Sequence, residues 1–215
     1  MPVYKGNLKH IDTNNVLTLA GQRAVDDATP EMAEEVCQTV VRLAQPVSVF
    51  YQFFYDKDTH TFLCNDPFVI EGETVRNYLE NTEVAIIMAV TLGKEVEDEL
   101  FMQKDFTKGI LMDSAISIAT EQMVGQLCGY IDTLGAPEGY KILWRITPGH
   151  SDTPQKQEVT LVQALQAAQI GISVTPTNML VPRKAVTAIV GMNHVGGEGG
   201  CSPSGCASCS HNCHE

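Results

Sequence analysis

The chain has 215 residues, of which 44% are hydrophobic and 19% are charged. A chain of this length can bury a sizeable core without disulfides, and its mean hydropathy of −0.04 excludes a globally disordered protein. No uncharged apolar run reaches the roughly 18 residues of a membrane-spanning helix. The first residues show no secretory signal, so a soluble cytoplasmic protein is expected.

The formal net charge of −12 argues against broad binding to nucleic acids or anionic membranes. The charge is unevenly distributed, because residues 141–184 carry five basic and two acidic side chains. This locally cationic segment could hold a small carboxylate or phosphate.

Residues 1–30 are of mixed character, with turn-like DTNN and DDATP segments. Helices are predicted at 30–45, 74–79, 94–102, 106–132 and 159–169 from apolar spacing, caps and breakers. Strands are predicted at 47–55, 61–64, 83–92, 141–146, 172–174 and 186–191, the third as a fully buried strand. The sequence therefore predicts an α+β fold with a mainly antiparallel twisted sheet packed against helices. Residues 1–195 form the predicted domain, and 196–215 a flexible Gly- and Cys-rich tail.

Two helices have unusual composition. Small side chains occur along the 106–132 helix, where they favour either close packing on the sheet or the approach of a flat ligand; they are Ser114, Ala115, Ser117, Ala119 and Gly125. The acidic run 95–99 is predicted to be a solvated helix face, or a surface that meets a basic partner.

The segment RITPGHSD after the fourth predicted strand favours a tight turn. Pro148 fixes its own φ and Gly149 tolerates a positive φ. Arg145, at the end of the strand, offers a planar fork that matches a carboxylate. The turn either holds the amino-acid end of a ligand or is an ordinary strand-to-loop turn with a surface arginine.

The seven cysteines form two groups. Cys37, Cys64 and Cys128 lie among apolar neighbours and are predicted to be reduced, packed thiols. The others crowd the C-terminus beside His211 and His214 and could wrap one soft ion; they are Cys201, Cys206, Cys209 and Cys213. Zinc, an iron–sulfur cluster and a contact to corrinoid cobalt all suit them, and a tail without metal is the alternative.

A longer pattern runs through these segments: RxxPGHxDxPQxQ, an amphipathic helix, IGISVTPTNMLVPRKAVTAIVGM and a Cys-rich end. It resembles the activation region of cobalamin-dependent methionine synthase, most closely its short stand-alone versions. The resemblance extends to ATEQM around Glu121 and to VTLGKEVED at 90–98. It implies a fold like that of the methionine synthase activation domain.

The resemblance also implies a function. The chain is expected to bind S-adenosylmethionine and to present it to cobalamin carried by a methyltransferase, methionine synthase above all. The ligand-binding positions fall on Arg145, Pro148, Gly149 and His150, with Glu121 as a polar contact from the preceding helix. His150 stands where the family usually has tyrosine. Because cobalt is the nucleophile, no catalytic side chain is expected, and the reaction implies a reductant such as flavodoxin or ferredoxin.

Two rival functions come from other classes. One is a metal- or iron–sulfur-binding accessory protein of corrinoid metabolism that acts through its cysteine-rich tail. The other is an interaction module that docks to a corrinoid protein without binding a ligand.

Overall fold

The computed structural model describes residues 1–21, 27–149 and 152–195. Its main sheet has seven strands in the order β4-β3-β2-β5-β9-β6, with β1 paired to β2, and every pairing is antiparallel. The strands are β1 (Val3–Lys5), β2 (Val47–Asp56), β3 (Thr61–Leu63), β4 (Phe68–Val69), β5 (Val84–Thr91), β6 (Tyr140–Ile146) and β9 (Val186–His194). A separate hairpin joins β7 (Ser173–Val174) to β8 (Leu180–Val181). The predicted α+β class is confirmed.

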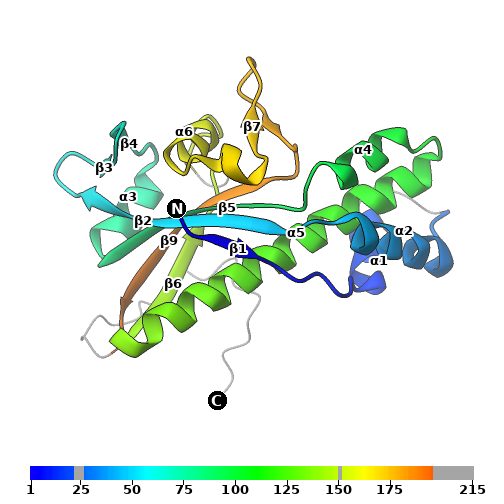
Figure 1. Ribbon diagram of the computed structural model, residues 1–215, viewed down its shortest axis with the longest axis horizontal. Helices are drawn as coiled ribbons and strands as arrows, with labels where there is room; N and C mark the ends of the chain where they lie inside the picture. The colour runs from blue at the N-terminus through cyan, green and yellow to red at the C-terminus, as the bar shows by residue number, and fades with distance from the viewer. Residues whose placement is uncertain (22–26, 150–151, 196–215) are drawn as a thin grey trace.

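Helices cover both faces of the sheet (Figure 1). One face carries α1 (Thr13–Gly21), α2 (Pro30–Leu43), α4 (Glu95–Met102) and the long α5 (Phe106–Gly135). The opposite face carries α3 (Glu73–Glu80), α6 (Gln157–Ala164) and the 3₁₀ turn η2 (Ala167–Ile170). Each face therefore has its own apolar core.

The central strand β5 explains the continuous apolar run in the sequence. It lies between β2 and β9, and each of its residues after Val84 is buried. A strand covered by helices on both faces needs apolar side chains at successive positions rather than alternate ones. The prediction of a fully buried strand is confirmed.

Local signals also set several helix starts. The Thr29 hydroxyl accepts a hydrogen bond from Met32 N (3.2 Å) and Pro30 occupies the first turn of α2, as predicted. Asp105 caps α5 in the same way, accepting from Lys108 N at 3.0 Å.

Two predictions of secondary structure were wrong. The DTNN segment is a helix start rather than a turn, because the Asp12 carboxylate accepts hydrogen bonds from Asn14 N and Asn15 N at the beginning of α1. The helix predicted at 159–169 ends as α6 at Ala164, because Gln166 adopts a left-handed conformation (φ +50°) before η2.

Candidate functional site

Arg145 lies on β6, the last strand in the sheet order. The pairing of β6 with β9 contains a bulge, since β6 advances from Ile142 to Trp144 while β9 advances by one residue. Ile142 packs on the α5 side of the sheet, whereas Trp144 packs on the opposite side. The extra residue, Leu143, thus reverses the alternation and returns Arg145 to the side of α5.

Glu121 meets Arg145 from the middle of α5. Arg145 Nη2 lies 2.5 Å from Glu121 Oε1, with 30% and 61% of the two side chains exposed. Near the end of the helix, the Asp132 carboxylate accepts a hydrogen bond from Ile142 N (2.7 Å) and so fixes α5 beside β6. The structure therefore brings together two of the predicted site residues, one basic and one acidic.

Cys128 lies close to this ion pair. Burial raises the pKa of its thiol, although the positive charge of Arg145 acts in the opposite direction. The thiol consequently stays protonated at neutral pH. Cys37, Cys64 and Cys128 are free cysteines, as predicted.

The turn that follows β6 is held by a hydrogen bond within the turn and by contacts with α3. Pro148 is buried, Gly149 has φ +83°, and Gly149 N donates to Thr153 O at 2.9 Å. The predicted tight turn is present, but the Gly149 amide already has a partner inside the turn. His150, also predicted to contact the ligand, lies outside the described residues.

Asp152 attaches this turn to the start of α3. Its Oδ2 accepts a hydrogen bond from Thr74 N at 3.0 Å, in the first turn of the helix. The turn packs so closely there that a Cβ at Gly72 would lie 3.0 Å from the Thr153 hydroxyl. Beside it, Lys156 Nζ lies 2.7 Å from Glu71 Oε1.

The Asp152 contact predicts a pH dependence. The Thr74 amide lowers the pKa of the Asp152 carboxyl, so its contribution to stability is present above the unfolded-state pKa and is lost as the pH falls through the lower folded-state pKa. Asp152→Asn removes that contribution. We expect the wild-type advantage in unfolding free energy over Asp152→Asn, measured by urea titration, to shrink as the pH is lowered from about 5 to about 2. An advantage that is constant with pH would contradict this assignment.

A second loop, residues 179–184 (MLVPRK), also contacts α5. Lys184 Nζ lies 2.8 Å from Asp113 Oδ1 and donates to Ser117 Oγ at 3.1 Å, one turn before Glu121. Arg183 N donates to Glu97 Oε1 at 2.7 Å, and Glu97 is buried. The acidic run 95–99 is therefore not wholly a solvated face, because Glu97 points into the fold to hold this loop.

The small residues of α5 differ in burial, and only the predicted close packing is confirmed. Ser114, Ala115 and Ala119 are buried in the core. Gly125 is exposed, and a Cβ built there or at Gly129 would meet no atom within 4 Å. Gly125 lies one helical turn after Glu121 and leaves an open strip along the helix.

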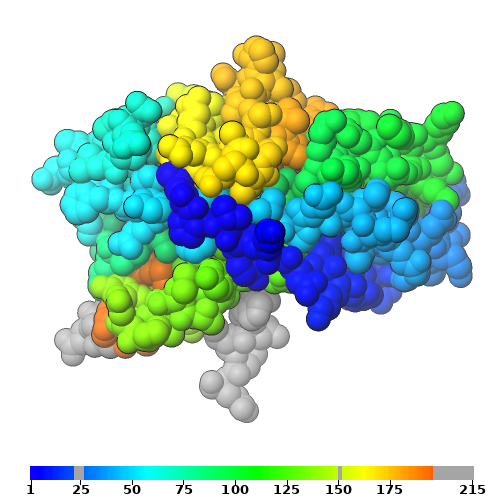
Figure 2. Space-filling model, viewed as in Figure 1, coloured from blue at the N-terminus to red at the C-terminus, as the bar shows by residue number. Residues whose placement is uncertain are grey.

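A cavity of about 570 Å³ adjoins that strip, and sequence analysis missed it. One side is the N-terminal segment from Asn7 to His10, and the other is Gln122 and Gln126 of α5. Gln126 holds the segment in place, because its amide accepts from Asn7 N (3.0 Å) and donates to Asn7 O (2.9 Å). Figure 2 shows the N-terminal part of the chain in dark blue on the surface of the molecule. The hollow is open to solvent rather than enclosed.

The predicted metal ligands Cys201, Cys206, Cys209 and Cys213 lie outside the described residues. Within residues 1–21, 27–149 and 152–195, no group of three or more histidine, cysteine or acidic side chains is arranged to hold a metal ion. The metal site of the tail remains a prediction, as does the division of the chain at residue 195. None of the described helices combines the length and apolar character that a membrane crossing requires.

Comparisons with known proteins support the fold. Neither a scan against protein-family models nor a search of curated proteins gives a match. Among solved structures, the chain is similar to a MetH reactivation domain whose crystal structure contains AdoHcy, with a TM-score of 0.53 and 12% sequence identity. The match covers 89% of this chain and 78% of that one. At this identity the likeness shows a shared fold, which agrees with the fold that the sequence resemblance implies.

Proposed function

We propose that this chain binds S-adenosylmethionine and presents its methyl group to cobalamin held by a partner protein. The observation that carries the proposal is the Arg145–Glu121 pair at the edge of the open strip on α5. The fold is that of a reactivation domain known with AdoHcy bound, which supports the same assignment.

The ion pair suits the amino-acid end of this ligand. That end is a zwitterion, so its carboxylate can bind the guanidinium of Arg145 and its ammonium can bind the carboxylate of Glu121. Both side chains are partly exposed, and exposed ion pairs contribute only about 0–1 kcal/mol to stability. Replacing the internal ion pair by two ion pairs with the ligand therefore costs little free energy.

In this reaction the main task of the chain is to position the ligand. The partner's cobalamin would supply the nucleophile: with one electron from an external reductant, cob(II)alamin would take the methyl group as its bond to sulfur breaks, giving methylcobalamin and S-adenosylhomocysteine. Arg145 and Glu121 hold the amino-acid end of the ligand, which is remote from the reacting methyl carbon. The protonated Cys128 thiol is a poor nucleophile and does not compete for the methyl group.

The proposed reaction needs a cobalamin-carrying partner and an electron donor. We propose a cobalamin-binding methyltransferase, methionine synthase above all, and a flavodoxin or ferredoxin as reductant. The first test is calorimetric titration of the full chain with AdoHcy, the stable product of the transfer. Saturable binding with one site per chain is expected, and absence of binding would overturn the proposal.

Gly125 gives a second test of the site. Gly125→Leu fills the open strip while adding a better helix former, so we expect AdoHcy affinity to fall at least about tenfold while stability stays equal or rises by up to about 1 kcal/mol. Calorimetry and urea unfolding measure the two quantities. Gly109→Leu is the matched control on the same helix, since a Cβ there also meets no atom within 4 Å. Equal affinity in both variants would place the ligand away from this strip.

A further inference from the structure

The part of the main sheet formed by β2, β3 and β4 has an uncovered apolar face. Phe54 of β2 pairs with Leu63 of β3. Two residues earlier on β3, Thr61 pairs with Val69 of β4. Phe54, Leu63 and Val69 therefore share one face of these strands, where they are between 45% and 70% exposed. We call these three residues the sheet patch.

The helices leave the sheet patch open. The alternate residues Phe53, Phe62 and Phe68 pack in the core beneath α3 and α6. The sheet patch consequently faces the side of α5, but none of its residues belongs to the core on that side. Contiguous exposed apolar side chains of this kind mark interaction surfaces.

A second apolar patch lies where α4 meets α5. Phe101 and Met102 end α4, Phe106 begins α5, and the three side chains are between 62% and 78% exposed. The guanidinium carbon of Arg183 lies 6.0 Å from the centroid of the Phe101 ring. We call Phe101, Met102 and Phe106 the corner patch. Along the longest axis of the molecule, this corner and the β3–β4 hairpin lie at opposite ends (Figure 1).

The two patches have unpaired charges of opposite sign beside them. Asp58, between β2 and β3, and Asp66, between β3 and β4, are exposed and have no ion-pair partner among the residues that the structure describes. Beside the corner patch, the exposed Lys104 and Arg183 are likewise unpaired within the described ranges. The carboxylate of Asp105 caps α5, where the helix N-terminus offsets its charge.

We infer that these two surfaces bind each other in successive copies of this chain, the corner patch of one copy on the sheet patch of the next. Each surface offers apolar side chains at its centre and the opposite charge at its rim. Two like patches would instead bring like charges together. Because the two surfaces differ, the contact joins copies head to tail in an open chain or a ring rather than in a closed dimer. The inference does not depend on the proposed function, since Arg145 and Glu121 belong to neither patch.

Sedimentation equilibrium of the full chain tests the assembly. Between about 10 µM and about 1 mM protein, in about 0.15 M salt, the weight-average mass should rise with concentration and exceed that of a dimer. A protein that stays monomeric would overturn the inference and leave both patches for partners of another kind. A mass that levels off at a dimer would also overturn it, because it would indicate a contact between like surfaces.

Charge reversal on either surface identifies the contact. Lys104→Glu with Arg183→Glu makes the corner acidic. Asp58→Lys with Asp66→Lys makes the rim of the sheet patch basic. Each double variant alone should associate at least about tenfold more weakly than wild type, because like charges then meet. An equimolar mixture of the two should recover association, since each reversed surface then meets its complement, and failure to recover would overturn the pairing of these two surfaces.

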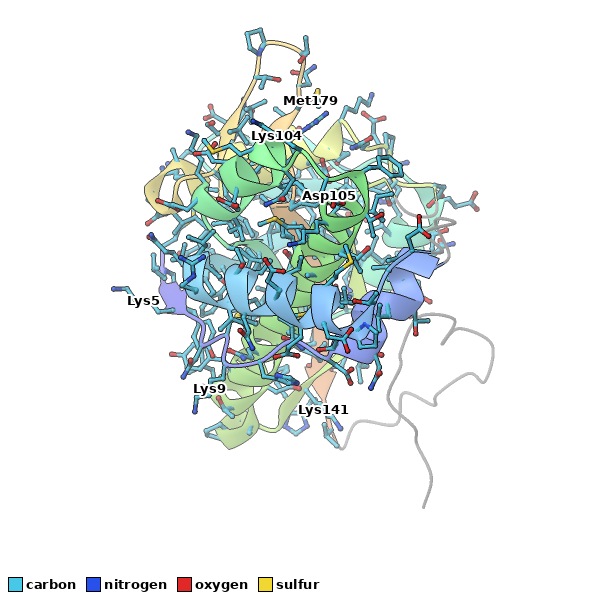
Figure 3. The ribbon with its side chains drawn as sticks, turned by 90° about the vertical axis from the view of Figure 1, so that its right-hand side faces the viewer. Lys5, Lys9, Lys104, Asp105, Lys141 and Met179 are labelled. Atoms are coloured by element: carbon cyan, nitrogen blue, oxygen red, sulfur yellow. The ribbon has the colours of Figure 1, made fainter. Side chains whose placement is uncertain are left out.

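Lys5→Glu with Lys9→Glu is the matched control for the corner variant. It changes the net charge equally, at two exposed lysines that lie far from Lys104 (Figure 3). It should associate like wild type, and an equal loss would mean that net charge governs association and would overturn the inference. Phe54→Ala and Phe106→Ala should each weaken association at least about fivefold, and wild-type association in both would also overturn it. Urea unfolding of each variant shows that it is folded.

Discussion

Replacing Arg145 by alanine should lower the affinity for AdoHcy by about 30- to 150-fold, equivalent to about 2–3 kcal/mol of binding free energy. In the proposed complex, the change would remove a charge-assisted pair with the ligand carboxylate and leave that carboxylate partly desolvated beside Glu121. Stability should change by no more than about 1 kcal/mol, because the internal ion pair is partly exposed. Calorimetry and urea unfolding of the same protein measure both quantities.

Lys141→Ala is the matched control for this variant. Lys141 is an exposed residue near the start of the same strand (Figure 3). Its neighbours Tyr140 and Ile142 pack on the α5 side of β6, so Lys141 points to the other side and its removal costs the same net charge without changing the α5 side. It should retain wild-type affinity. If both variants lost affinity equally, a long-range field rather than a specific contact would explain the effect. If Arg145→Ala bound AdoHcy as well as wild type, the carboxylate would have to lie elsewhere.

The parts of the fold that local chemistry determines were predictable from sequence. The start of α2 follows from Thr29 and Pro30, and β5 follows from an apolar run too continuous for a half-exposed strand. These signals lie within a few residues of the structure they specify. Arg145 could also be singled out, because its residue type and the following turn suit a carboxylate.

The side of the sheet on which Arg145 lies was not predictable. Regular alternation would place Arg145 opposite Ile142, away from α5, and only the bulge at Leu143 reverses that arrangement. The bulge depends on the pairing of β6 with β9, which lies more than 40 residues later in the chain. No pattern of neighbouring residues specifies the register in which β6 pairs with β9.

The cavity was missed for a related reason. The segment from Asn7 to His10 shows no periodicity, and its position depends on hydrogen bonds between Asn7 and Gln126, which are 119 residues apart. Sequence analysis did single out the small residues of α5 and offered two alternative roles for them. It could not tell that Gly125 faces open space while Ala115 and Ala119 face the core.

The bulge itself leads to the prediction with the largest effect on stability. It places the indole of Trp144 directly against Gly191 of β9, where an added Cβ would overlap the ring. The ring cannot easily move, since Trp144 Nε1 donates to Thr82 Oγ1 at 2.9 Å and the ring packs on Tyr78 with centroids 5.3 Å apart. In an ordinary strand position, alanine would stabilise relative to glycine by about 0.5–1 kcal/mol. At this position the steric overlap makes alanine destabilising relative to glycine.

We therefore expect Gly191→Ala to lower the unfolding free energy by about 2–3 kcal/mol, measured by urea titration. Gly109→Ala, at an open position on α5, should instead stabilise by up to about 1 kcal/mol. Adding Trp144→Leu to Gly191→Ala makes room for the methyl group, so the double variant should be more stable than the sum of the single effects predicts. Because Arg145 follows Trp144, Gly191→Ala should also weaken AdoHcy binding. A Gly191→Ala protein as stable as wild type would mean that Trp144 does not lie against β9, and the bulge that places Arg145 beside α5 would then be wrong.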